Sequence, residues 1–419
     1  MEDERNLELE SLVDPPPLDP PPPPGFEEKP PKAPGRPRWV SLALIAGACA
    51  LLVGLGIWIG AGIGSSKTTQ PPESAQLQSP PETTTTPEST APSEPGWEAN
   101  LLRADPVPYQ SEDVYDWDDE AKVFPVLGSE YRREQIASVT FLDTLADAPE
   151  NAWDVSETGD GRVMAWVTPA NDLYDLYIAA EGGVSAANAC SDLFAGYSNA
   201  KTINFGEAFH TTGAADMSCM FLGCKALTDL DLSSFDTSCV QDMSGMFSGC
   251  SSLRYLTLGD SFDTSAVRDM SFMFGGCCRL TDLDLSDFDT SVVQDMSQMF
   301  IGCNSMKNLD LSGLNTSNVQ DMSEMFNFCY TLTELDLSSF GTSCVQDMSG
   351  MFFSCYSLTD LTLGDSFDTS AVRDMSFMFN SCNSLTDLTL GDSFVTTNAN
   401  SEHMFTNCPA GADYQHLLN

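Results

Sequence analysis

The chain has 419 residues, and its 61 acidic and 18 basic side chains give a formal net charge of −43 at pH 7. Binding to nucleic acid needs a basic surface, so this charge excludes nucleic acid as a partner. It favours instead a soluble surface that meets basic or cation-bridged partners.

Residues 1–38 are rich in proline and acidic residues and include the run PPPLDPPPPP at 15–24. They predict a disordered, polyproline-like tail, or a docking site for a proline-binding domain. Residues 39–63 form an unbroken apolar run without a charge, long enough to cross a bilayer as one helix. Four basic residues precede this run: Lys29, Lys32, Arg36 and Arg38. A lone Lys67 follows it, so the positive-inside rule places the N-terminus in the cytoplasm.

Two alternatives to an uncleaved anchor are a cleaved signal peptide and a lipoprotein acceptor at Cys49, which follows Ala-Gly-Ala. The long tail before the run and the apolar residues after Cys49 favour the anchor. The predicted location is therefore the cell membrane, as a single-pass protein with an extracellular repeat domain. Gly56 and Gly60 form a GxxxG pair through which two anchor helices could dimerise.

Two regions separate this run from the repeats. Residues 64–96 are rich in Ser, Thr and Pro without apolar periodicity, which predicts an extended extracellular linker. Residues 97–172 are apolar enough to fold, and the segments SVTFLDT (138–144) and VMAWV (163–167) have the pattern of strands. They predict a β-rich N-terminal cap, because the end of a repeat array must be covered.

Residues 173–408 are a repeat array, with a degenerate first turn at 173–197. The copy at 227–250 reads LTDLDLSSFDTSCVQDMSGMFSGC. The copies end in cysteines about 26 or 27 residues apart: Cys224, Cys250, Cys277, Cys303, Cys329, Cys355, Cys382 and Cys408. This period is typical of stacked repeat proteins. Residues 409–419, beyond the last cysteine, are expected to form the C-terminal cap.

The first half of each copy has the pattern of a strand. In the copy at 227–250, Leu227, Leu230 and Leu232 follow the L-x-x-L-x-L spacing of leucine-rich repeats. On a strand, Leu230 and Leu232 point to one face, while Asp229 and Asp231 point to the other. We therefore expect a short strand with a buried leucine face and an exposed acidic face.

The second half of each copy has the pattern of a helix. Met243, Met246, Phe247 and Cys250 recur at i, i+3, i+4 and i+7, which predicts one apolar stripe of a short helix. Asp242 precedes this stripe and could cap its first turn.

A single copy cannot bury its own apolar side, so the copies are expected to stack. One predicted ladder of core residues contains Phe247, Phe274, Phe300, Phe326, Phe352 and Phe379. A second contains Phe209, Phe235, Phe262, Phe288, Leu314, Phe340, Phe367 and Phe394. The predicted fold class is an α/β protein. It is a right-handed, leucine-rich-repeat-like solenoid, with short parallel strands on one face, short helices on the other and one transmembrane helix.

The repeated phrase L-T-x-L-D-L-S-x-F-D-T-S-x-V-x-D-M-S-x-M-F-x-x-C, as in residues 280–303, resembles the BspA-like leucine-rich-repeat surface proteins of bacteria. The lead-in segments NAWDVS (151–156) and VMAWV (163–167) are similar to what precedes those repeats, so the resemblance covers roughly residues 135–408. It implies a surface-exposed protein with an adhesive or protein-binding role. It transfers no site residues.

The outward strand positions are the candidate partner-binding site. They are Asp229, Asp231, Tyr255, Asp282, Asp284, Asn308, Asp310, Glu334, Asp336, Asp360 and Asp387, with Thr257, Thr362 and Thr389 among them. Stacked, they predict an acidic face that could bind basic protein segments, or calcium through adjacent carboxylates. The alternative is a solvated acidic face that serves only solubility.

Neither the cysteines nor the methionines indicate a cofactor. The chain contains no C-x-x-C pair, and the Cys and Met positions of each copy fit core packing better than metal or haem ligation. No Ser–His–Asp or Cys–His arrangement with a credible base is present, so the expected function is not catalytic. We predict adhesion to, or binding of, host or bacterial surface proteins. The alternatives are a structural spacer without a ligand and an enzyme activity hidden in residues 97–172.

Overall fold

The computed structural model describes residues 96–104, 124–307 and 309–418. Every described residue belongs to one compact unit, Glu88–Asn419. The predicted tail (1–38) and membrane span (39–63) lie outside the described residues, as does the predicted linker except for Gly96.

The expected membrane protein has no support in the structure. In the part of the chain that the structure describes, no helix combines the length and the apolar character needed to cross a bilayer. The predicted location in the cell membrane, with a transmembrane helix, is corrected accordingly and is not carried further. The possible anchor dimer concerns residues 39–63, which lie outside the described residues, and it stays a prediction.

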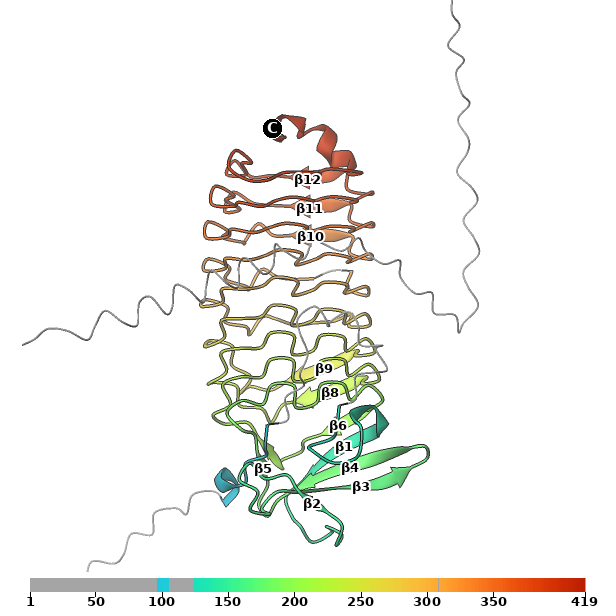
Figure 1. Ribbon diagram of the computed structural model, residues 1–419. Coiled ribbons are helices and arrows are strands. Elements are labelled where there is room, and N and C mark those ends of the chain that lie inside the picture. Colours follow the sequence, from blue (N-terminus) through green and yellow to red (C-terminus); the bar gives the residue numbers. More distant parts are fainter. Residues whose placement is uncertain (1–95, 105–123, 308, 419) are drawn as a thin grey trace, which may run out of the picture. The chain divides into compact units, whose positions relative to one another are not determined.

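A mixed sheet forms the N-terminal part of the folded unit. Its strands are β1 (Ile136–Leu142), β2 (Trp153–Asp154), β3 (Met164–Ala170), β4 (Leu173–Ala179) and β6 (Thr202–Asn204), in the order β2-β3-β4-β1-β6. β1 pairs in parallel with β4 and β6, while β3 pairs antiparallel with β2 and β4. The strand half of the predicted first turn (β4) is thus separated from the next copy, because β1 lies between β4 and β6 (Figure 1).

The remaining strands are short and belong to separate sheets. They are β5 (Val184–Ser185) with β7 (Phe209–His210), β8 (Asp229–Leu232) with β9 (Tyr255–Leu258), and β10 (Glu334–Asp336) with β11 (Asp360–Thr362) and β12 (Asp387–Thr389). Each pair is parallel and joins equivalent residues of successive copies, such as Leu230 with Leu256 and Leu335 with Leu361. Successive copies therefore lie one above the other (Figure 1).

The predicted helices are absent from the described residues. The helices that the described residues do contain are short 3-10 segments, namely η1 (Gly96–Ala99), η3 (Arg133–Gln135), η4 (Pro409–Ala412) and η5 (Gln415–Leu417). The predicted fold class, a right-handed leucine-rich-repeat-like α/β solenoid with a helix in each copy, is therefore wrong. The unit consists instead of short strands in several sheets, joined by turns.

Two successive turns replace each predicted helix. In one copy, the N–H of Met220 donates to the carbonyl of Met217 at 3.3 Å, and that of Cys224 to Phe221 at 3.2 Å. The N–H groups of Met217 and Phe221 donate instead to carbonyls of the following copy. Cys219 has φ +56°, the left-handed conformation that type II turns place at their third position. An α-helix cannot contain such a residue. The segment therefore forms two successive turns, and other backbone N–H groups of the segment donate to carbonyls of the following copy.

The aspartate predicted to cap each helix forms a ladder of isolated parallel bridges. The bridged residues are Ala189, Asp216, Asp242, Asp269, Asp295, Asp321, Asp347, Asp374 and Asn400. Each Asp side chain also closes a local turn: the Asp242 carboxylate accepts the N–H of Ser244 at 2.9 Å and its hydroxyl at 2.6 Å. The Asp-Met-Ser motif thus forms an Asx turn, which directly precedes the two successive turns described above.

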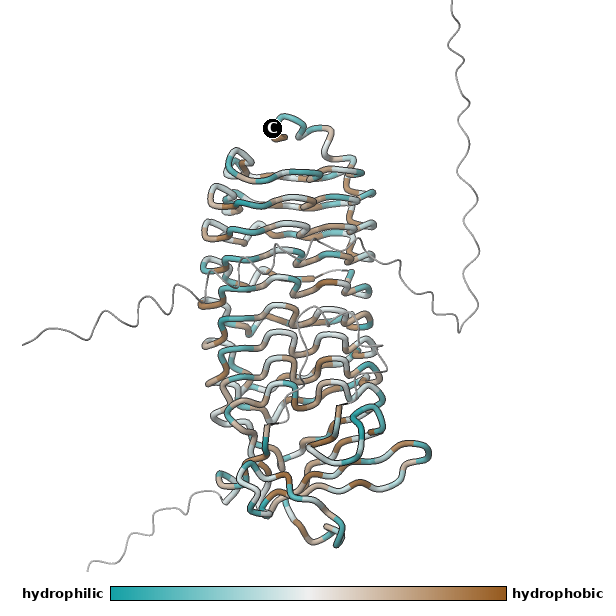
Figure 2. The backbone as a smooth tube through the Cα atoms, viewed as in Figure 1, coloured by the Kyte–Doolittle hydropathy of each residue, from teal (hydrophilic) through white to brown (hydrophobic). Residues whose placement is uncertain are grey.

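The predicted core ladders are confirmed. Rings of successive copies stack in parallel, as in Phe221–Phe247 at 5.8 Å and Phe352–Phe379 at 5.6 Å between centroids. The second ladder, from Phe209 to Phe394, is also buried. Hydrophobic and hydrophilic stretches recur in the stacked copies (Figure 2), and the residues of both ladders are buried.

The buried cysteine and threonine side chains connect the copies by hydrogen bonds. The Cys250 thiol donates to the carbonyl of Phe221 in the preceding copy at 3.2 Å, and Cys303 to Phe274 at 3.1 Å. Burial raises the pKa of Cys224 and of Cys329 to about 12, which keeps both thiols protonated. The Thr237 hydroxyl donates to the backbone carbonyl of Asp263 in the following copy at 2.8 Å. The thirteen described cysteines form no disulfide with one another.

Both ends of the stack are covered. At the first turn, the buried Arg133 guanidinium donates to the carbonyls of Asp192 and Ala195 at 2.6 and 2.7 Å. At the last turn, the Tyr414 hydroxyl donates to the carbonyl of Leu388 at 2.7 Å, and its ring stacks on Phe405. The contacts to Ala195 and Leu388 satisfy carbonyls that have no further copy to pair with.

Candidate functional site

The predicted strand-face residues are solvent-exposed. Exposed positions are Asp229, Asp231, Tyr255, Asp282, Asp284, Asp310, Glu334, Asp336, Asp360 and Asp387. Asn308 lies outside the described residues. The parallel register stacks these positions, so that Asp229 lies beside Tyr255, and Glu334 beside Asp360 and then Asp387.

An open groove of about 840 Å³ runs over the middle of this face. Six of the predicted residues contribute to its lining, namely Asp282, Asp284, Asp310, Glu334, Asp336 and Asp360. Leu256, Leu283, Leu309 and Leu335 also line it. Asp229, Asp231, Tyr255 and Asp387 do not. The structure thus gathers one part of the predicted face into a concave site and leaves the rest outside it.

The groove has an apolar floor that the sequence analysis missed. Leu230 and Leu361 occupy the same repeat position as the floor residues and are 2% and 0% exposed, whereas Leu256, Leu283 and Leu309 are only partly buried. Each copy from residue 227 onward carries a leucine there, so no sequence signal separates the covered positions from the open ones.

Hydrogen bonds from the backbone hold part of the acidic rim in place. The carboxylates of Asp284, Asp310 and Asp336 accept the N–H of the serine two residues later at 3.0, 3.0 and 2.9 Å. Hydrogen bonds from these serines lower the pKa of all three aspartates. These side chains are therefore anionic at neutral pH and remain so under mildly acidic conditions.

Within the described ranges, none of the groove carboxylates takes part in an ion pair. Metal binding has no preformed site there either, because the same ranges contain no group of three or more His, Cys, Asp or Glu side chains arranged around a common point. The groove can attract cations, but its geometry offers rows of single charges rather than a chelating cluster.

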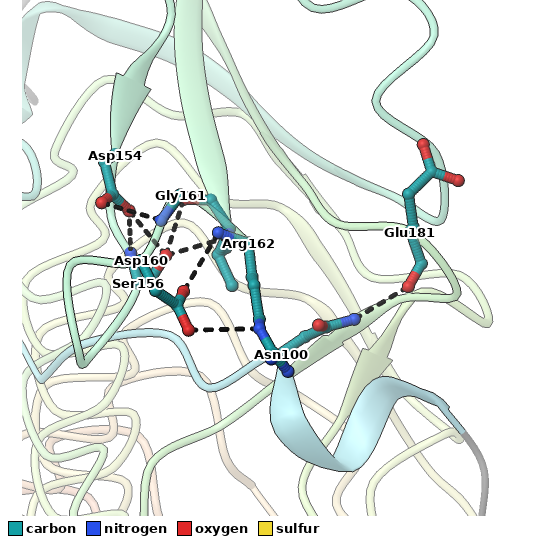
Figure 3. Close-up of polar contacts among 8 residues, drawn as sticks. Asn100, Asp154, Ser156, Asp160, Gly161, Arg162 and Glu181 are labelled. Carbon is teal, nitrogen blue, oxygen red and sulfur yellow. Dashed lines mark hydrogen bonds and ion pairs between the residues drawn. The ribbon is translucent and has the colours of Figure 1, made fainter.

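The N-terminal sheet contains a cluster of polar contacts (Figure 3). The Asp154 carboxylate accepts the hydroxyl and the N–H of Ser156 at 2.5 and 2.8 Å, and the N–H of Gly161 at 3.0 Å. The Ser156 oxygen in turn accepts the N–H of Val163 at 3.1 Å. Both groups of the Asp154–Ser156 pair are thus used to close the β2–β3 loop, and no contact of this pair favours the enzyme hypothesis for residues 97–172.

A row of aromatic rings forms a second exposed surface, which the sequence analysis did not single out. The row connects Phe328, Tyr330, Phe353, Tyr356, Phe377 and His403. Tyr330 and Tyr356 are 39% and 44% exposed and stack at 5.1 Å between ring centroids. The sequence does contain a signal for this row of rings, because earlier copies carry glycine at the position that Phe328 occupies.

Comparison with known families matches the repeats and leaves strands β1 to β4 of the N-terminal sheet unmatched. The family described as "Mycoplasma protein of unknown function, DUF285" matches residues 188–309, 215–334 and 302–414, together more than half of the chain. No curated protein and no solved structure matches the chain. The match is compatible with the BspA-like resemblance of the repeats without establishing it. The chain belongs to the DUF285 family of repeat proteins.

Proposed function

We propose that this chain is a non-catalytic protein that binds another protein through its strand face, in adhesion to a host or bacterial surface protein. The observation that carries the proposal is the groove, which combines partly exposed leucines with a rim of carboxylates that form no ion pair among the described residues. Such a combination on a protein surface is typical of an interaction site.

Variation among the copies supports the same conclusion. From residue 227 onward the inward position of the strand is leucine in each copy, as in Leu230, Leu256 and Leu283. The outward position before it is Asp229, Tyr255 or Asp282 in these copies. Packing fixes the inward residue, while the outward residues are free to serve a partner. The resemblance to BspA-like surface proteins agrees with a binding role.

The test is a binding screen of the full chain against purified matrix and cell-surface proteins, with and without calcium. A variant with Asp284→Lys, Asp310→Lys and Asp336→Lys should bind any partner at least about tenfold more weakly. Circular dichroism of the variant controls for folding. Unchanged binding by this variant would remove the strand face from consideration, and no binding by the unaltered chain would favour a structural spacer.

A further inference from the structure

The strand face loses its ladder of hydrogen bonds over the middle copies. β8 pairs with β9, and β10 with β11 and β12, but the described residues at 281–285 and 309–311 form no strand. The opposite side of the same copies stays closely stacked, with Phe274, Phe300 and Phe326 at 5.8 and 5.7 Å between successive centroids. The interruption of strand pairing thus coincides with the groove, while the opposite side of these copies keeps its stacked rings.

The floor of the groove is a row that follows the stack. Leu256, Leu283, Leu309 and Leu335 occupy equivalent positions in successive copies, and the first three are only partly buried. Water contacts this apolar surface in the free protein, so a partner that covers it with apolar side chains gains hydrophobic free energy. The occupant should therefore present its own row of apolar side chains.

The rim determines the charge of the occupant. The carboxylates of Asp282, Asp284, Asp310, Glu334, Asp336 and Asp360 border the leucine row. Within the described ranges none of them is neutralised by an ion pair, and a concave surface concentrates their field. Basic side chains on both sides of the apolar row of the partner would match this rim.

The direction of the leucine row favours a helix over an extended segment. The row follows the stack and therefore crosses the direction of the strands, which pair in parallel before and after the groove. An extended segment along the row would turn its backbone N–H and C=O groups toward apolar leucines without a strand to pair with, whereas a helix satisfies these groups within itself.

We propose that the groove docks an amphipathic helix of the partner protein, with its apolar row on the leucines and its Lys and Arg side chains at the acidic rim. This inference rests on the proposed function and specifies the chemistry of the partner. It requires a helix of about four turns, or about 22 Å, to follow the row across its copies.

Two synthetic peptides of identical Leu and Lys composition test the proposal with the full chain. One has leucines at i, i+3, i+4 and i+7, and the other alternates Leu and Lys. The helical peptide should bind at least about tenfold more tightly than the alternating one, as measured by calorimetry. Equal binding of the two peptides, or tighter binding of the alternating one, would overturn the helical occupant.

Three variants locate the binding of the helical peptide. Leu283→Ser with Leu309→Ser removes the apolar floor, and Asp284→Asn with Asp310→Asn and Asp336→Asn removes rim charge while keeping the oxygen that accepts the serine N–H. Each variant should weaken binding about tenfold, whereas the control Asp229→Asn with Asp231→Asn, on the same face outside the groove, should change it less than about twofold. An equal loss in the control would show general attraction by charge and overturn the groove.

The two proposals fail separately. If neither peptide binds, while a purified matrix protein still binds the unaltered chain and not the Asp284→Lys, Asp310→Lys and Asp336→Lys variant, the helical occupant is wrong and the proposed function stands. If this variant binds the matrix protein as well as the unaltered chain does, both proposals are wrong.

Discussion

Each aspartate of the Asp-Met-Ser ladder lies between its counterparts in the copies before and after it. Asp295 is bridged to Asp269 and Asp321, and its carboxylate accepts the N–H of Ser297 at 2.8 Å. Burial, opposed in part by the Ser297 hydrogen bonds, raises the pKa of Asp295 to about 6, and the neighbouring aspartates add to the shift. Folding therefore increases the proton affinity of this carboxyl group.

A raised pKa in the folded state predicts a loss of stability as pH rises. The contribution of Asp295 is fully present below its unfolded pKa of about 3.9 and is lost as pH rises through about 6. Asp295→Asn keeps the acceptor oxygen and removes the charge, as the chain itself does at Asn400, whose oxygen accepts the N–H of Glu402. The variant should match the parent near pH 4 and be about 1–3 kcal/mol more stable at pH 7.5.

Urea denaturation at a series of pH values measures this difference. Asp284→Asn is the matched control, because hydrogen bonds from Ser286 lower the pKa of Asp284. The ionised form of Asp284 therefore stabilises the folded state, which is the opposite of the effect of Asp295. That variant should lose stability relative to the parent at neutral pH. A constant difference between Asp295→Asn and the parent from pH 4 to 7.5 would contradict the account.

At the scale of one element, the pair of turns explains why the sequence predicted a helix. In two adjacent four-residue turns the first and last residues of each face the core, as Met217, Met220, Phe221 and Cys224 do. Their spacing is i, i+3, i+4 and i+7, the same as the apolar stripe of a helix. Apolar periodicity therefore cannot distinguish the two structures.

The residues between these positions do distinguish them. The equivalent positions Gly223, Gly249, Gly276 and Gly302 have φ between +69° and +72°, whereas Ser354 stands at the same position with φ +61°. This conformation costs a residue with a Cβ atom about 1–2 kcal/mol of folding free energy. Glycine avoids that cost, but part of the advantage is lost because glycine has more conformational freedom in the unfolded state. The repeated glycines are thus a signal for turns inside a segment that looks helical.

Ser354→Gly should therefore raise the free energy of unfolding by about 0.5–1 kcal/mol. Gly249→Ala tests the same position in the opposite direction and should lower it by about 1 kcal/mol. A Cβ atom at Gly249 would meet Gly223 at 3.4 Å, an ordinary contact, so the effect would come from the backbone conformation. Midpoints of urea denaturation at constant slope measure both changes, and a neutral Gly249→Ala would contradict this explanation.

Sequence reasoning thus found the repeat, its core and the outward strand positions, because all three follow from apolar spacing. It failed at the predicted helices, because the pair of turns has the same spacing as a helix. It also failed to place the groove, because Leu256 and Leu361 are the same residue in the same repeat position and differ only in how closely neighbouring copies pack. Such packing differences depend on tertiary contacts that a repeated pattern does not encode.

At the scale of the whole chain, acidic side chains dominate. The net charge is −43, and stacking places carboxylates of successive copies side by side, both on the strand face and along the Asp ladder. The first arrangement supplies the field of the groove, and the second loses free energy through the repulsion of neighbouring charges. The same stacking that assembles the core and the groove therefore opposes folding electrostatically.

Screening should relieve this repulsion. Raising NaCl from 0.01 to 0.1 M shortens the Debye length from about 30 to about 10 Å, which should stabilise the full chain by about 1 kcal/mol and raise its Tm by about 2–4 °C at pH 7.5. At pH 4 many carboxyl groups are protonated, so the same addition of salt should have a smaller effect. Differential scanning calorimetry at both pH values measures the two shifts. A salt effect of equal size at pH 4 would show that salt acts by some means other than screening of the acidic side chains.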